Sequence, residues 1–86
     1  MDEGASGPRI LALVPGYEEG PRIGRVVEAA SRHLPVLVVD DGSADDTAAV
    51  AEAAGARVIR QVPNQGKGAA LRAGFRLALD EGWDAV

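Results

Sequence analysis

Short apolar segments alternate with amphipathic segments along this chain, and this alternation restricts the possible folds more than any other feature of the sequence. Residues 10–14 and 36–39 are uninterrupted apolar runs, which are typical of strands buried on both faces of a parallel sheet. A third strand is predicted at residues 56–62, where two arginines indicate an edge position. A fourth strand is predicted to begin at residues 83–86.

The amphipathic segments predict three helices, at residues 21–34, 48–54 and 69–80. Ser43 and Asp46 are predicted to cap the second helix. Leu71, Phe75 and Ala78 are expected to share the apolar face of the third. Alternating strands and helices predict an α/β fold, a three-layer α/β/α sandwich around a parallel, Rossmann-like sheet with right-handed crossovers.

The composition is that of one small globular domain, because hydrophobic types make up 47% of the 86 residues. The net charge of −4 argues against nucleic acid or an anionic membrane as the main partner. The absence of cysteine excludes disulfides and thiolate metal sites. The longest apolar run is too short to span a bilayer. Residues 1–8 are expected to form a disordered lead-in, and residues 9–86 a single domain.

Polar residues follow three of the predicted strands, and in an open parallel sheet ligands bind beyond the carboxyl ends of the strands. Tyr17 offers a flat ring on which a nucleobase can stack. Asp40 or Asp41 can accept a hydrogen bond from a base N–H. Lys67, between two glycines at the start of a helix, can reach a phosphate as a point charge. These residues predict a nucleotide site at one edge of the sheet.

Each of these residues also has a purely structural interpretation. Tyr17 can be an ordinary loop aromatic, and Glu18 and Glu19 can be solvated charges ahead of a helix. Asp40 can terminate a strand while Asp41 starts a turn. Two common phosphate motifs are absent: the chain has no G-x-x-x-x-G-K-[ST], and the glycines after the third predicted strand do not complete a G-x-G-x-x-G.

Three stretches, residues 14–19, 38–47 and 64–74, together resemble the family 2 glycosyltransferases of the GT-A fold. The likeness extends over nearly all of residues 9–86 and is greatest to the branch of dolichyl-phosphate mannose synthases and related polyprenyl-phosphate glycosyltransferases. Each motif is weak alone, but three in the right order at the right strand ends are specific. One departure is Glu18, which stands where the first motif usually has asparagine.

The resemblance implies an enzyme that moves a sugar from a nucleotide-diphosphate donor, such as GDP-mannose or a UDP-sugar, to an acceptor such as polyprenyl phosphate. In such enzymes the first motif contacts the nucleotide, the acidic pair contacts base and ribose, the preceding residue lines the base, and the lysine lies near the donor. The residues at these positions here are Pro15, Tyr17 and Glu19; Asp40 and Asp41; Val39; and Lys67.

The resemblance also implies Mg²⁺ or Mn²⁺, held on the donor diphosphate by a D-x-D segment that normally follows the fourth strand. We expect the 86 residues to be an N-terminal part of the GT-A domain that stops before this segment, with no catalytic or metal-binding residue of its own. The parent enzyme is expected in the cytoplasm, at the inner face of the membrane. The alternative is a stand-alone nucleotide-binding or regulatory module without catalysis, which a stop codon after Val86 would indicate.

Overall fold

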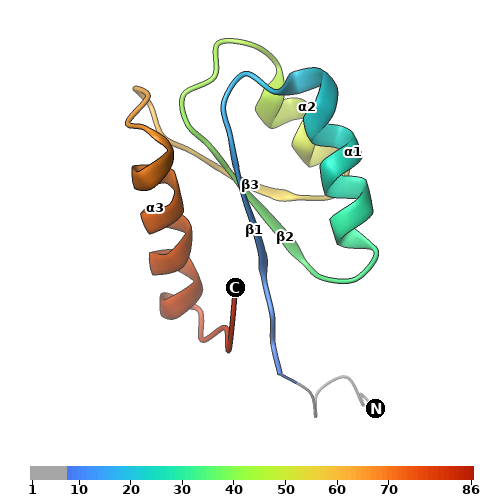
Figure 1. The fold of residues 1–86 in the computed structure, drawn as a ribbon, viewed down its shortest axis with the longest axis vertical. Helices are drawn as coiled ribbons and strands as arrows, with labels where there is room; N and C mark the ends of the chain where they lie inside the picture. Colours follow the sequence, from blue (N-terminus) through green and yellow to red (C-terminus); the bar gives the residue numbers. More distant parts are fainter. Residues whose placement is uncertain (1–7) are drawn as a thin grey trace.

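The computed structural model describes residues 8–86. Three strands, β1 (Ala12–Gly16), β2 (Val36–Asp40) and β3 (Arg57–Arg60), alternate with three helices, α1 (Gly20–Ser31), α2 (Thr47–Ala53) and α3 (Lys67–Asp80). Helices α1 and α2 lie on one side of the sheet and α3 on the other (Figure 1). This arrangement confirms the predicted α/β sandwich, while most of the expected lead-in lies outside the described residues.

The sheet is parallel, in the order β1-β2-β3. Strand β3 is therefore at an edge, as its arginines predicted, although it is shorter than expected. Instead of a full fourth strand, the structure has a single parallel bridge between Ile10 and Ala85, where Leu11 N–H donates to the Ala85 carbonyl at 3.0 Å. The chain after α3 thus returns to the side of β1 that faces away from β2. Because the three strands are parallel, their carboxyl ends lie at the same end of the sheet.

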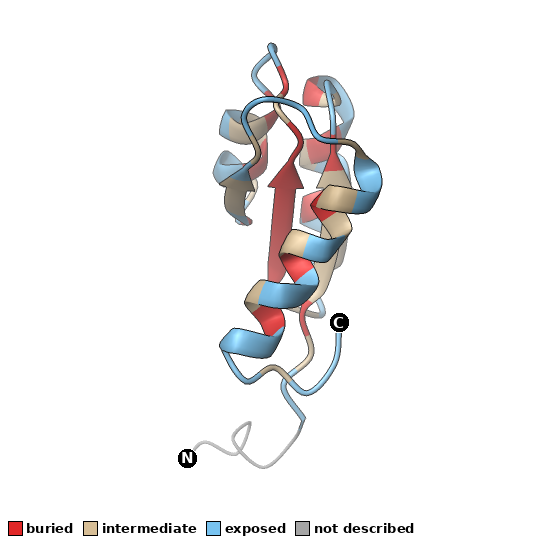
Figure 2. Ribbon diagram, turned by 90° about the vertical axis from the view of Figure 1, so that its left-hand side faces the viewer, coloured by how far each residue is buried: buried red, intermediate tan, exposed pale blue. Residues whose placement is uncertain are grey.

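Strand β2 is buried along its whole length, as its apolar run predicted (Figure 2). Successive side chains on a strand point to opposite faces. Val36 and Val38 pack with α1 and α2, while Leu37 and Val39 pack with α3. This one strand therefore joins the two halves of the core.

Strand β1 begins and ends two residues later than predicted, because the run continues through Pro15 and Gly16 rather than stopping at Val14. Pro15 and Gly16 stay in register with Val39 and Asp40 of β2. A proline is tolerated there because its missing N–H takes no bond from the ladder. This extension brings the first loop to the same level as the end of β2.

The predicted cap of α2 is wrong in its hydrogen bonds. Asp46 occupies the N-cap position, but its side chain makes no capping bond. Asp45 acts instead, because its carboxylate accepts the Thr47 N–H at 3.0 Å and also the Thr47 hydroxyl. Ser43 contacts the first loop, where its hydroxyl accepts the Glu18 N–H at 2.7 Å. A long-range partner has displaced the local one.

The buried face of α3 agrees with the prediction only in part. Its buried residues are Ala70, Gly74 and Ala78, so Ala78 is buried as predicted, whereas Leu71 is only partly buried and Phe75 is 43% exposed. A Cβ at position 74 would lie 2.3 Å from Leu13 Cδ1, so only glycine lets α3 approach β1 this closely. The spacing of the small residues, rather than that of the large ones, sets the orientation of the helix.

Within residues 8–86, no helix combines the length and the apolar character that a membrane crossing requires.

Candidate functional site

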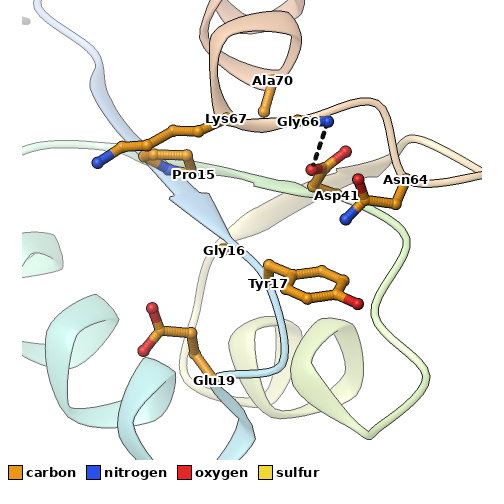
Figure 3. Close-up of a pocket in the computed structure, with 9 residues that line it drawn as sticks. All are labelled: Pro15, Gly16, Tyr17, Glu19, Asp41, Asn64, Gly66, Lys67 and Ala70. Atoms are coloured by element: carbon orange, nitrogen blue, oxygen red, sulfur yellow. Dashed lines mark hydrogen bonds between the residues drawn. The ribbon is translucent and has the colours of Figure 1, made fainter.

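A cavity of about 530 Å³ lies at the carboxyl ends of β1 and β2, beside the first turn of α3 (Figure 3). Its lining comes from three separate segments: the end of β1 with its loop, the residue after β2, and the loop leading into α3 together with the first turn of that helix. The lining residues are Pro15, Gly16, Tyr17, Glu19, Asp41, Asn64, Gly66, Lys67 and Ala70.

The structure brings together five of the seven residues predicted for the site: Pro15, Tyr17, Glu19, Asp41 and Lys67. It does not bring Val39 or Asp40 to the cavity lining. Val39 is fully buried in the core beneath α3, and the side chain of Asp40 is only 1% exposed. Val39 and Asp40 thus lie within the protein, next to residues that line the cavity.

Asp41 connects the end of β2 to the loop before α3. Its Oδ1 accepts the Gln65 N–H at 2.8 Å and the Gln61 side-chain amide at 3.1 Å. Its Oδ2 accepts the Gly66 N–H at 2.8 Å. A carboxylate oxygen can accept two hydrogen bonds, so Oδ2 keeps a second acceptor position, although Asp41 as a whole is only 4% exposed.

Tyr17 stands at the cavity with half of its surface exposed. Asp41 and Asn64, which line the same cavity, come from the two other segments of the lining (Figure 3). An exposed aromatic face beside hydrogen-bonding groups is the arrangement that recognises a planar heterocycle. This placement favours the binding interpretation of Tyr17 over that of an ordinary loop aromatic.

The backbone around Tyr17 is held from outside the loop. Glu18 has a φ of 51°, which is uncommon for a residue other than glycine. Its N–H donates to the Ser43 hydroxyl, and the Glu19 N–H donates to Thr47 Oγ1 at 3.0 Å. The pKa of Asp45 is held below the ordinary 3.8, chiefly by the hydrogen bond from the Thr47 hydroxyl and also by the Thr47 N–H. Asp45 therefore stays charged while it holds Thr47, the residue that accepts the Glu19 N–H.

The two glutamates of the first loop behave differently. Glu18 is absent from the cavity lining, and its carboxylate is 3.5 Å from the Ala44 N–H. Glu19 lines the cavity and pairs with Arg22 in the first turn of α1 at 3.0 Å. The charge at position 18, where the family motif usually has asparagine, is therefore directed to the α2 side of the loop.

Asp40 is held between two elements. Its Oδ1 accepts the Ser43 N–H at 3.1 Å, and its Oδ2 accepts Arg60 Nε at 3.2 Å. Arg60 Nη2 also donates to the Ser43 carbonyl at 3.0 Å. A buried carboxylate is stable only with such partners, so the structural interpretation of Asp40 accounts for its contacts.

Lys67 is the first residue of α3, and its side chain extends past Pro15, on the side away from Asp41 and Tyr17 (Figure 3). In the part of the chain that the structure describes, no carboxylate forms an ion pair with it. Its positive charge is therefore not neutralised by a carboxylate of that part of the chain.

Four lining residues were missed as site residues by the sequence analysis: Gly16, Asn64, Gly66 and Ala70. Asn64, Gly66 and Ala70 lie in the third motif, residues 64–74. The motif was placed correctly at the site, but these three residues were not predicted to line the cavity. Gly16 lines the cavity because β1 continues past Pro15. Across residues 8–86, no group of three or more His, Asp or Glu side chains is arranged to hold a metal ion.

Comparison with known proteins gives a consistent result. The model of the family described as Glycosyl transferase family 2 matches residues 12–83. The chain is 34% identical over 87 residues to an undecaprenyl-phosphate mannosyltransferase of Micrococcus luteus, covering 91% of this chain and 35% of that protein. It is 32% identical to a polyprenol monophosphomannose synthase of Mycolicibacterium smegmatis, covering 91% and 33%.

Among solved structures, glucosyl-3-phosphoglycerate synthase from Mycobacterium tuberculosis, in complex with Mn²⁺, UDP and glucosyl-3-phosphoglycerate, superposes with a TM-score of 0.73 at 32% identity. The match covers 84% of this chain and 30% of that one. The chain thus spans about a third of the length of these three proteins.

Proposed function

This chain belongs to glycosyl transferase family 2, and from that premise we propose that its cavity binds the nucleoside diphosphate portion of a nucleotide-sugar donor. The observation that supports this most directly is the meeting of Tyr17, Asp41 and Lys67 at one cavity from three separate segments. They supply a flat ring, a hydrogen-bond acceptor and a positive charge, which match the base and the phosphates of one ligand.

In this proposal the base stacks on Tyr17, and the second acceptor position of Asp41 Oδ2 takes a ring N–H of the base. Uracil and guanine both carry such an N–H, so a UDP-sugar and GDP-mannose are the two candidate donors. Pro15 and Glu19 contact the nucleotide from the β1 side. Val39 and Asp40 do not contact the nucleotide in this proposal. Val39 packs in the core beneath α3, and Asp40 holds the turn at Ser43.

Lys67 compensates phosphate charge at the start of α3. The ammonium is a point charge on a flexible stem, and the first backbone N–H groups of a helix favour an anion at the same end. A 14-residue helix beginning at this lysine combines both effects. The diphosphate is therefore proposed to lie between Pro15 and the first turn of α3.

For the whole enzyme, we propose transfer of a sugar from this donor to an acceptor of the polyprenyl-phosphate class at the inner face of the membrane. The names of the two bacterial relatives support the acceptor class. A divalent cation, Mg²⁺ or Mn²⁺, is proposed because a structural neighbour holds Mn²⁺ with UDP. Residues 8–86 offer no cluster of ligands for it, so no role proposed for these residues uses the cation.

Calorimetric titration of the chain with UDP, GDP and ADP tests the proposal. UDP and GDP are expected to bind more tightly than ADP, because adenine has no ring N–H for Asp41. Tyr17→Phe is expected to bind as the original chain does, whereas Tyr17→Ala loses stacking worth about 1–3 kcal/mol. A folded chain that shows neither heat nor a spectroscopic change with millimolar UDP and GDP would contradict the proposal.

A further inference from the structure

We propose that Arg60 is a positioning residue for the nucleotide site, acting through Asp40 and Ser43 on the loop that carries Tyr17. Arg60 does not line the cavity. Its contacts nevertheless lead, one hydrogen bond at a time, to the residues that do. The role in binding rests on the nucleotide site proposed above, whereas the role in holding the loop is independent of any ligand.

The first step joins β3 to the turn after β2. The guanidinium donates through Nε to Asp40 Oδ2 at 3.2 Å and through Nη2 to the Ser43 carbonyl at 3.0 Å. Asp40 Oδ1 in turn accepts the Ser43 N–H at 3.1 Å. Both backbone polar groups of Ser43 are thus held by one ion pair, whose carboxylate is buried and whose guanidinium is half exposed.

The second step joins this turn to the first loop. Ser43 is 4% exposed, and its hydroxyl accepts the Glu18 N–H at 2.7 Å. Glu18 has the positive φ of 51° described above, a conformation that persists where the surroundings impose it. The residues on either side of Glu18 are Tyr17 and Glu19, and both line the cavity. A displaced Ser43 would therefore release the stacking ring.

The geometry requires arginine rather than any cation. A guanidinium presents several N–H donors in a rigid plane, so one side chain can bond Asp40 and the Ser43 carbonyl together. A lysine ammonium on a flexible stem keeps the charge but not this fixed pair of directions. Arg60→Lys therefore keeps the positive charge beside Asp40 but loses the paired hydrogen bonds to Asp40 and the Ser43 carbonyl, so it distinguishes the effect of charge from that of geometry.

The same strand supplies a matched control. Arg57 is the first residue of β3 and Arg60 the last, with side chains 53% and 50% exposed. Arg57 is also paired with a carboxylate, through two bonds to Glu81 at 2.8 and 3.0 Å. Glu81 follows α3, at the opposite end of that helix from Lys67. Arg57→Gln thus removes an ion pair from the same strand without touching the cavity, although the Glu81 carboxylate is 34% exposed where that of Asp40 is 1% exposed.

The first experiment needs no ligand. Amide hydrogen exchange of Glu18 is measured by NMR in the original chain, Arg60→Gln, Arg60→Lys and Arg57→Gln. We expect Glu18 exchange to be roughly tenfold faster in Arg60→Gln, equivalent to about 1.4 kcal/mol, with partial rescue in Arg60→Lys and no change in Arg57→Gln. The ring signals of Tyr17, the single tyrosine, are expected to move only in the Arg60 variants. Unchanged Glu18 exchange in Arg60→Gln would overturn the inference.

The second experiment measures UDP and GDP affinity in the same variants. We expect roughly tenfold weaker binding in Arg60→Gln and unchanged binding in Arg57→Gln. Equal weakening in both variants would mean a general loss of stability and would overturn the inference. If the original chain binds neither nucleotide, the proposed function fails, and Glu18 exchange still decides the role of Arg60.

Arg60→Gln leaves a buried carboxylate without its cation, and this can unfold the chain. The double variant Asp40→Asn/Arg60→Gln removes that charge while still lacking the guanidinium bridge. It is expected to fold and to show the same fast Glu18 exchange. A folded double variant with the original exchange rate and nucleotide affinity would count against the inference.

Discussion

The carboxylate of Asp41 accepts the backbone N–H of Gly66 at 2.8 Å, and this bond joins the end of β2 to the residue that precedes α3. The proposed contact for the base and the proposed contact for the phosphates are therefore parts of one hydrogen-bonded unit. The distance between Asp41 and Lys67 is set before any ligand arrives. Such preorganisation lowers the entropic cost of binding.

Asp41→Asn tests this unit. An asparagine has only one acceptor oxygen, so its amide nitrogen must face the N–H of Gln65 or of Gly66. We expect the free energy of unfolding to fall by about 1–3 kcal/mol and nucleotide affinity to fall with it. Urea unfolding and calorimetry measure the two effects.

Asp80→Asn is the matched control for this prediction, because Asp80 is an exposed carboxylate at the far end of α3. It is expected to leave stability within about 0.5 kcal/mol of the original value. Equal stability of Asp41→Asn and Asp80→Asn would show that the bonds to the loop contribute nothing.

Lys67→Met tests the proposed place of the phosphates. The change keeps the aliphatic stem and removes the charge, so affinity for UDP is expected to fall while affinity for uridine stays the same. The loss should shrink at high salt, because an exposed charge is screened. Calorimetry with both ligands measures the difference.

Arg72→Met is the control here, since Arg72 is an exposed cation on the same helix but does not line the cavity. If the Arg72 variant loses as much UDP affinity as the Lys67 variant, long-range charge accounts for the effect and Lys67 has no specific contact.

The ion pair between Arg57 and Glu81 predicts a dependence of stability on pH. Hydrogen bonds from Arg57, and then from Trp83, hold the pKa of Glu81 at about 2, below the ordinary 4.5. A carboxyl whose pKa is lower in the folded state stabilises that state when it is charged. The contribution of Glu81 is therefore complete above pH 4.5 and is lost as the pH falls from about 4.5 towards 2.

Glu81→Gln measures that contribution. The original chain is expected to be more stable than the variant at neutral pH, and the gap should close through the acid range in urea titrations. The effect is small because the pair is partly exposed and screened. Glu52→Gln, which removes an exposed carboxylate on α2, is the comparison. A gap between original and variant that stays constant down to the lowest pH measured would refute the assignment.

Gly74→Ala tests the close packing of α3 on β1. The added Cβ would lie 2.3 Å from Leu13 Cδ1, so the helix or the leucine must move. We expect a loss of about 1–3 kcal/mol in the free energy of unfolding, as for other overpacked cores.

Gly68→Ala, in the first turn of α3, is the control, because a Cβ there meets only the end of the Arg72 side chain, at 3.4 Å. It should be neutral or stabilising by up to about 1 kcal/mol. Comparable losses in the two variants would contradict the packing argument.

The layered arrangement, with helices on both faces of the sheet, could be predicted from local pattern. Burial on both faces of a central strand requires apolar side chains along the strand. Residues 36–39 meet that requirement, and β2 is buried throughout. The edge position of β3 followed from its arginines. The shared edge where the site lies followed from the parallel connection alone, since parallel strands end on the same side.

The roles of neighbouring side chains could not be predicted in this way. Asp40 and Asp41 are chemically identical in the sequence, yet Asp40 is paired with Arg60 and Asp41 with the loop before α3. Consecutive residues at a strand end face different surroundings, and these depend on how β3 and the following loop pack beside β2. The prediction of Ser43 as a helix cap was wrong for a similar reason. Its actual partner, the Glu18 N–H, is 25 residues away in the sequence and could not be identified from local pattern.

The chain alone thus specified its layers, the edge position of its third strand and the segments that meet at the carboxyl ends of the strands, because burial and backbone connectivity are local properties of the sequence. Which carboxylate faces the cavity, which supports it from behind and which arginine holds the loop depended on contacts between residues 17 to 28 positions apart. Those contacts form only when the folded chain brings their partners within hydrogen-bond distance.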